Sequence, residues 1–163
     1  VYQKAEQEMS IDELCEWIRA SASMPLVSRI VEIGGRKLLD GGVSDSIPLR
    51  YFQEIGFQRN VVILTQPRDY VKQPTSFMPL MRLALRKYPH MLSALMHRHV
   101  MYNAQLRYLE EQEKLGQTLV IAPERKLKIN HTSHDPAIMQ EVYDMGKQQG
   151  LAELNRIKAF LFA

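Results

Sequence analysis

The feature that most constrains this 163-residue chain is its segment 36–48, which has the sequence RKLLDGGVSDSIP. Two leucines are typical of the end of a buried strand, and Asp40 follows where that strand stops. Gly41 and Gly42 come next, and because they lack a Cβ they allow either a positive φ or a close backbone approach. A carboxylate at the carboxyl end of a strand is a common site for chemistry in an α/β sheet. The same residues are also typical of a plain strand–turn–helix corner with a solvated Asp.

The residues before this segment predict a β-hairpin that leads directly to Asp40. Residues 27–33 are rich in β-branched side chains and residues 36–39 return as a second strand. Gly34-Gly35 lies between them and is a hairpin turn signal.

The residues after it predict a short amphipathic helix over 47–55. Ser46 is expected to cap this helix, Pro48 to lie in its first turn and Gly56 to stop it. The side chains expected to face inward are Leu49, Phe52 and Ile55.

A helix is also predicted from Ser10 to about residue 20. Ser10 and Glu13 fit a capping box, and apolar residues follow at helical spacing. Cys15, the chain's one cysteine, falls on that apolar face and is therefore expected to be buried. A single cysteine excludes an internal disulfide framework and fits a reducing compartment.

Two apolar runs, 60–65 and 118–123, predict strands buried on both faces, as in a parallel sheet. The second run can add to the same sheet as the first. The order helix, hairpin, helix, buried strand suits one edge of a three-layer α/β sandwich. So few strands cannot bury two faces of a sheet, which indicates that further strands belong to it.

The rest of the chain is predicted to be mainly helical, with a loop at 66–79 before it. Residues 77–87 form an apolar-basic helix that either packs on the core with its cations in water or lies on a membrane surface. Other expected elements are a long helix from Pro89 to about Leu115 closed by Gly116, an edge strand at 126–129, and two helices at 136–147 and 151–162.

Composition and short motifs exclude several classes of function. The hydrophobic fraction of 45% and net charge of +3 are ordinary for a globular protein, and no run approaches the length of a membrane span. The small basic excess argues only weakly for an anionic partner, and no nucleic-acid recognition motif is present. His97 and His99 point away from each other on a helix, and the cluster His131–Asp135 is too tight for a catalytic triad. No metal and no cofactor is therefore expected.

Two motifs resemble those of the patatin-like phospholipases. Asp40-Gly41-Gly42-Val43 is similar to the Asp-Gly-Gly box of that family, and residues 20–25, ASASMP, resemble its A-S-x-A-x-P loop. The resemblance covers about residues 8–66, and the later part is similar to the C-terminal extension of a bacterial subgroup. Patatin-like enzymes are lipid acyl hydrolases that use a Ser–Asp dyad, with the serine in a G-x-S-x-G elbow. The resemblance implies that Asp40 is the acid–base partner of such a serine.

The resemblance also implies a fold and a division of the chain. Residues 1–66 are expected to be the C-terminal part of a patatin-like three-layer α/β/α sandwich. Residues 67–163 are expected to form a mainly helical extension with one or two added strands. The chain starts Val1-Tyr2-Gln3 without a Met and lacks a G-x-S-x-G, so it is interpreted as a C-terminal fragment of a longer enzyme.

The predicted function follows from these points. The parent is expected to hydrolyse lipid or other acyl esters in lipid metabolism, and this chain alone is expected to be inactive. A cytoplasmic location is expected, with peripheral membrane contact as an open alternative. The rival interpretation is a non-catalytic lipid- or protein-binding module, whose nine methionines supply an adaptable apolar surface.

Overall fold

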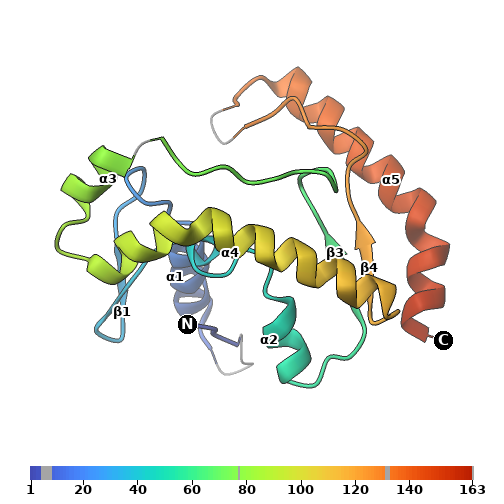
Figure 1. The fold of residues 1–163 in the computed structure, drawn as a ribbon, viewed down its shortest axis with the longest axis horizontal. Helices are drawn as coiled ribbons and strands as arrows, with labels where there is room; N and C mark the ends of the chain where they lie inside the picture. Colours follow the sequence, from blue (N-terminus) through green and yellow to red (C-terminus); the bar gives the residue numbers. More distant parts are fainter. Residues whose placement is uncertain (5–8, 77, 131–132, 163) are drawn as a thin grey trace. The chain divides into compact units, whose positions relative to one another are not determined.

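The computed structural model describes residues 1–4, 9–76, 78–130 and 133–162 (Figure 1). It confirms a mixed α/β chain whose C-terminal part is mainly helical. The chain divides into two compact units, which are described separately. Unit 1 comprises Val1–Ile47 and Lys72–Gln105, and unit 2 comprises Pro48–Val71 and Leu106–Ala163. The predicted domain boundary after residue 66 stays a prediction.

Unit 1 begins with helix α1 (Ile11–Ser21). The Ser10 side chain accepts a hydrogen bond from the Glu13 backbone N–H at 3.2 Å, which confirms the predicted N-cap. The expected burial of the apolar face is wrong: Cys15 is exposed, as is Ile11 at 80%. Helical spacing gathers apolar side chains on one face, but it does not show whether another element covers that face.

The predicted hairpin is confirmed as β1 (Val31–Ile33) and β2 (Arg36–Leu38), which pair antiparallel. Gly34 and Gly35 have φ values of 55° and 73°, the left-handed conformation that a tight two-residue hairpin turn requires. The first strand is shorter than expected. Residues 24–28 form a turn instead, in which the Ser28 N–H donates to the Met24 carbonyl at 2.9 Å.

A 3₁₀ turn, η1 (Gly41–Val43), follows the hairpin and contributes to the core of unit 1. Helix α3 (Met78–Ala84) and the first half of α4 (Pro89–Lys114) supply the other side of that core. The predicted loop before α3 and the long helix up to Gly116 are both confirmed. Phe77, expected at the start of the apolar-basic helix, lies outside the described residues. The buried core residues are Val43, Leu85 and Leu95, with Met81, Tyr88, Met91 and Ala94 packed against them.

Unit 2 begins with helix α2 (Leu49–Glu54). Pro48 precedes this helix, so its predicted place in the first turn is wrong. Pro48 is the N-cap and no side chain caps the helix, so the predicted role of Ser46 is wrong. Gly56, at φ 103°, stops the helix as predicted. Of the three residues expected to face inward, only Leu49 is buried, whereas Phe52 and Ile55 are exposed.

Strands β3 (Asn60–Ile63) and β4 (Thr118–Ile121) pair in parallel, which confirms that both apolar runs belong to one sheet. All four residues of β4 are buried. The expectation for β3 is wrong, because no residue of β3 is fully buried and Ile63 is 72% exposed. A continuous apolar run therefore predicted the parallel pairing correctly and overestimated the cover on the outer strand.

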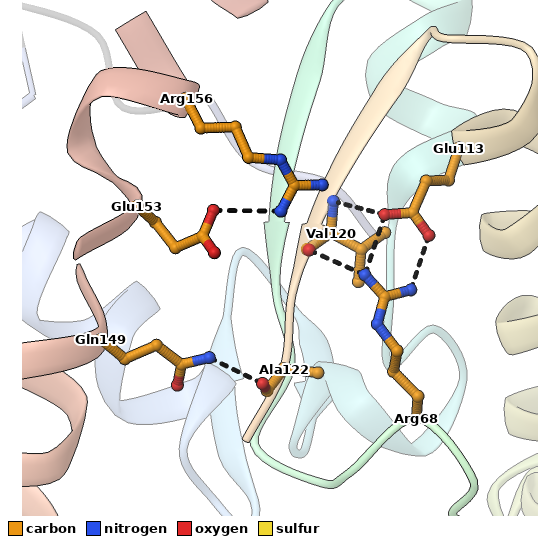
Figure 2. Close-up of polar contacts among 7 residues, drawn as sticks. All are labelled: Arg68, Glu113, Val120, Ala122, Gln149, Glu153 and Arg156. Atoms are coloured by element: carbon orange, nitrogen blue, oxygen red, sulfur yellow. Dashed lines mark hydrogen bonds and ion pairs between the residues drawn. The ribbon is translucent and has the colours of Figure 1, made fainter. Parts of the chain in front are cut away.

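An ion pair ties the loop after β3 to α4 and β4 (Figure 2). The Arg68 guanidinium donates to both carboxylate oxygens of Glu113, at 2.6 and 2.9 Å. Arg68 also donates to the Val120 carbonyl, and Glu113 accepts from the Val120 N–H. The hydrogen bonds from Arg68 lower the pKa of Glu113, and the positive charge of Arg68 adds a smaller effect in the same direction.

We expect this pair to make the stability of the protein sensitive to acid. Because the pKa of Glu113 is lower in the folded state, its contribution is present above its unfolded pKa and is lost as the pH falls through the folded value. Glu113→Gln should lower the free energy of unfolding at pH 7 by about 1 kcal/mol and should flatten its decline in acid. Urea denaturation at a series of pH values measures both effects. Exposed Glu111, on the same helix, is the control, and an equal effect of Glu111→Gln would contradict this role.

The chain ends in one long helix, α5 (Pro136–Phe162), where two helices were predicted. Gly146 and Gly150 both lie inside this helix. Each glycine in a helix interior costs only about 1 kcal/mol, and neither ends the helix. The Gln149 side chain donates to the Ala122 carbonyl at 2.8 Å, just after β4 (Figure 2). The predicted edge strand at 126–129 does not form. No described helix has the length and apolar character needed to cross a membrane.

Candidate active-site turn

Asp40 lies two residues after the end of β2, at the start of η1, where the sequence placed it. Its side chain is half-buried, and its Oδ1 accepts a hydrogen bond from the Gly42 N–H at 2.7 Å. Within the described ranges, Oδ2 has no hydrogen-bond partner. One carboxylate oxygen therefore accepts a backbone hydrogen bond, and the other has no partner in the part of the chain that the structure describes.

The structure resolves the role of the two glycines in the box. Neither has a positive φ, so the turn does not need the left-handed conformation there. A Cβ on Gly42 would lie 3.1 Å from Asp40 Oδ1 and 3.6 Å from the Arg98 guanidinium. The absence of a side chain at Gly42 thus lets the Asp40 carboxylate and the Arg98 guanidinium lie close to its backbone. A Cβ on Gly41 would meet nothing within 4 Å.

Two side chains donate hydrogen bonds to the carbonyl of Gly42. Ser46 Oγ donates to it at 2.6 Å and Arg98 Nε donates to it at 2.9 Å. Arg98 comes from α4, 56 residues further along the chain. Gly42 therefore donates through its N–H to the Asp40 carboxylate and accepts through its C=O from Arg98.

A second residue of α4 fixes the segment that follows the turn. Gln105 is seven residues after Arg98, which places both on one face of the helix. Its side-chain amide donates to the Asp45 carboxylate and accepts from the Ile47 N–H at 3.1 Å. Asp45 also accepts a hydrogen bond from the Tyr2 hydroxyl.

The ASASMP loop adjoins Asp40 directly. The Asp40 N–H donates to the Ser23 carbonyl at 2.8 Å. Ser23 is buried, and its hydroxyl donates to the Arg19 carbonyl at 2.7 Å in the last turn of α1. This serine therefore has a structural hydrogen bond that fixes the loop beside Asp40.

Lys72 adds a second cation near Arg98 on the same unit. Burial, and secondarily the charge of Arg98, lower the pKa of the Lys72 ammonium. The Lys72 ammonium lies 5.2 Å from the centre of the Tyr102 ring. The Asn103 side chain accepts from the backbone N–H of Lys72 and donates to its backbone carbonyl.

The sequence patterns predicted a role for neither Arg98 nor Gln105. The signal present was the spacing of polar residues at i and i+7 on a long helix, which does not name their partners.

Other candidate groups in the sequence are not brought together in a site. In the described ranges, no three His, Cys, Asp or Glu side chains are arranged to hold a metal ion. Asp135 caps α5 by accepting from the Ala137 N–H at 2.9 Å. Ser133 bonds Asn130 rather than a histidine, and His131 lies outside the described residues.

Comparison with known proteins finds two family models along the chain. Residues 2–52 match the model described as Patatin-like phospholipase, which confirms the predicted resemblance over a segment that starts and ends earlier than the expected 8–66. This match supports a relationship to a hydrolase family. Residues 88–162 match a domain of unknown function (DUF6363). No curated protein and no solved structure matches the chain.

The hydrogen bond from Arg98 to Gly42 joins the two matched segments. Gly42 belongs to the first match and Arg98 to the second. Val43, from the first match, and Leu95, from the second, also belong to the same buried cluster in the core of unit 1. The first helix of the domain of unknown function is thus part of the structure that surrounds the Asp-Gly-Gly box.

Proposed function

We propose that this chain supplies the acid–base carboxylate of a patatin-like serine acyl hydrolase that acts on lipid or other acyl esters. The observation that carries the proposal is the geometry of Asp40. Its Oδ1 is held by the Gly42 N–H while Oδ2 has no partner in the described residues. The box also lies inside the segment that matches the patatin-like family.

In the proposed mechanism, a serine hydroxyl attacks the ester carbonyl while the Asp40 carboxylate accepts its proton. The tetrahedral intermediate collapses, the alcohol leaves with that proton, and an acyl-enzyme remains. Asp40 then takes a proton from water as the water oxygen attacks the acyl carbonyl. It returns that proton to the serine oxygen as the acyl–serine bond breaks and the carboxylic acid leaves. The negative charge on the carbonyl oxygen needs backbone N–H donors, which the resemblance assigns to a glycine-rich loop.

The printed sequence lacks the other parts of this machinery. None of its nine serines lies in a G-x-S-x-G, and no glycine-rich oxyanion loop is present. We therefore propose that the nucleophile comes from sequence outside these 163 residues and that this chain alone is inactive. We also propose a cytoplasmic location, because a single cysteine fits a reducing compartment.

A fluorophosphonate ester probe tests the proposal, because it forms a covalent bond only with an activated serine. Intact mass is measured before and after reaction, for this chain and for the full-length protein. We expect the full-length protein to gain one probe mass and this chain to gain none. Labelling of this chain would show that one of its own serines is activated and would overturn the assignment of roles.

The same experiment distinguishes the alternative of a non-catalytic binding module. That alternative is supported by the exposed apolar side chains of α1 and α3. A full-length protein that binds lipid vesicles, remains unlabelled by the probe and cleaves no ester would favour it.

A further inference from the structure

We propose that helix α3, together with the residues up to Lys87, docks onto an anionic lipid surface. The docking surface is defined as Leu80, Arg82, Leu83, Arg86 and Lys87. The inference concerns binding and does not depend on the hydrolase chemistry proposed above. It rests on the distribution of charge along the chain and on the exposure of the two leucines.

The acidic residues of the chain are unevenly spread along the sequence. No Asp or Glu occurs between Asp69 and Glu110, a stretch that contains six Lys and Arg residues. Of the 18 acidic residues, five lie in the first 16 positions and eight lie from Glu110 onward. A stretch of this length with one sign of charge creates a local positive potential and attracts an anionic surface.

The side chains of α3 and of the turn that follows it divide into an inner and an outer set. Met81 and Leu85 pack into the core of unit 1. Leu80 and Leu83, three residues apart, share another face and are 57% and 67% exposed. Core packing, the first of the two alternatives for this helix, therefore accounts for only part of its apolar side chains.

The cations of the docking surface are available for lipid headgroups. Arg82, Arg86 and Lys87 are all exposed, and none forms an ion pair within the part of the chain that the structure describes. Exposed leucines beside exposed cations are the combination that binds a helix in the interfacial plane of an anionic membrane.

The hairpin extends the basic character of this end of unit 1. The Lys37 ammonium lies 5.7 Å from the centre of the Tyr88 ring, one residue after the docking surface. Arg36 is exposed beside it, and Glu32, the one acid of the hairpin, is opposite Lys37 in the register. Charge complementarity therefore favours an anionic lipid surface over a basic or neutral partner.

Flotation with vesicles tests the proposal on the full-length protein. The vesicles contain about 30 mol% phosphatidylglycerol in phosphatidylcholine, a negative surface of the kind that attracts basic segments. Ether-linked lipids are used so that no ester can be hydrolysed, which keeps this test separate from the hydrolase proposal. We expect binding to these vesicles and little binding to pure phosphatidylcholine. Equal binding to both, or to neither, would overturn the proposal.

Variants localise the binding to the docking surface. Arg82→Gln/Arg86→Gln should lower the vesicle partition coefficient by about 25-fold, since each cation near an anionic surface contributes about fivefold. The matched control is Arg125→Gln/Lys126→Gln, which removes the same charge from an exposed segment elsewhere. Leu80→Ser/Leu83→Ser tests the apolar part, with the circular dichroism melting curve as a check on folding. An equal loss in the control would show attraction by net charge alone and would overturn the assignment to α3.

Discussion

Asp40→Asn should abolish ester hydrolysis by the full-length protein, with a loss in kcat of about 10⁴-fold. The asparagine keeps an oxygen that can accept the Gly42 N–H, so the turn is expected to retain its geometry. It cannot accept a proton from a serine at neutral pH, and the loss therefore reports the carboxylate's chemistry. Initial rates with a short-chain ester, measured beside a thermal melting curve, test both parts of this expectation.

A second substitution separates the chemical role of Asp40 from its structural role. Asp40→Ala should be as inactive as Asp40→Asn, but should also lower the free energy of unfolding by about 1 kcal/mol because the cap of η1 is lost. Glu32→Gln, an exposed carboxylate on the hairpin that leads to Asp40, is the control and should keep its activity within about twofold. Undiminished hydrolysis by Asp40→Asn would exclude Asp40 as the dyad's acid–base group.

Local patterns in the sequence predicted the turn that contains Asp40 and much of the fold around it. Gly34-Gly35 predicted the hairpin because a two-residue turn needs positive φ, and the structure shows positive φ there. Two apolar runs predicted the parallel pairing of β3 with β4. These features depend on a few neighbouring residues or on a strong, continuous pattern.

The errors have a common physical origin in contacts between distant parts of the chain. Cys15 and Ile63 were expected to be buried because apolar neighbours surround them in sequence, but burial depends on what covers a face. Ser46 was expected to cap α2, yet its hydroxyl bonds the carbonyl of Gly42 instead. Arg98 could not be assigned to the box, since no local rule links residues 56 positions apart.

That distant contact leads to the second large expected effect. Arg98→Met should lower kcat of the full-length protein by about 10²-fold, with KM nearly unchanged. Arg98 touches no reacting atom in the proposed mechanism and acts as a positioning residue. It holds the Gly42 carbonyl, while the N–H of Gly42 holds Asp40. Displacement of a catalytic group by about 1 Å is enough for a loss of this size.

The conservative variant and a control on the same helix show whether positioning is the cause. Arg98→Lys keeps a donor that can reach the Gly42 carbonyl, and should recover most of the lost kcat. Arg107→Met removes an exposed cation from α4 and should leave kcat unchanged. A fall in thermal stability with no specific fall in kcat would show that Arg98 only stabilises the fold. The expected pattern would instead give the domain of unknown function a defined task, because its first helix would hold the Asp-Gly-Gly box in its working geometry.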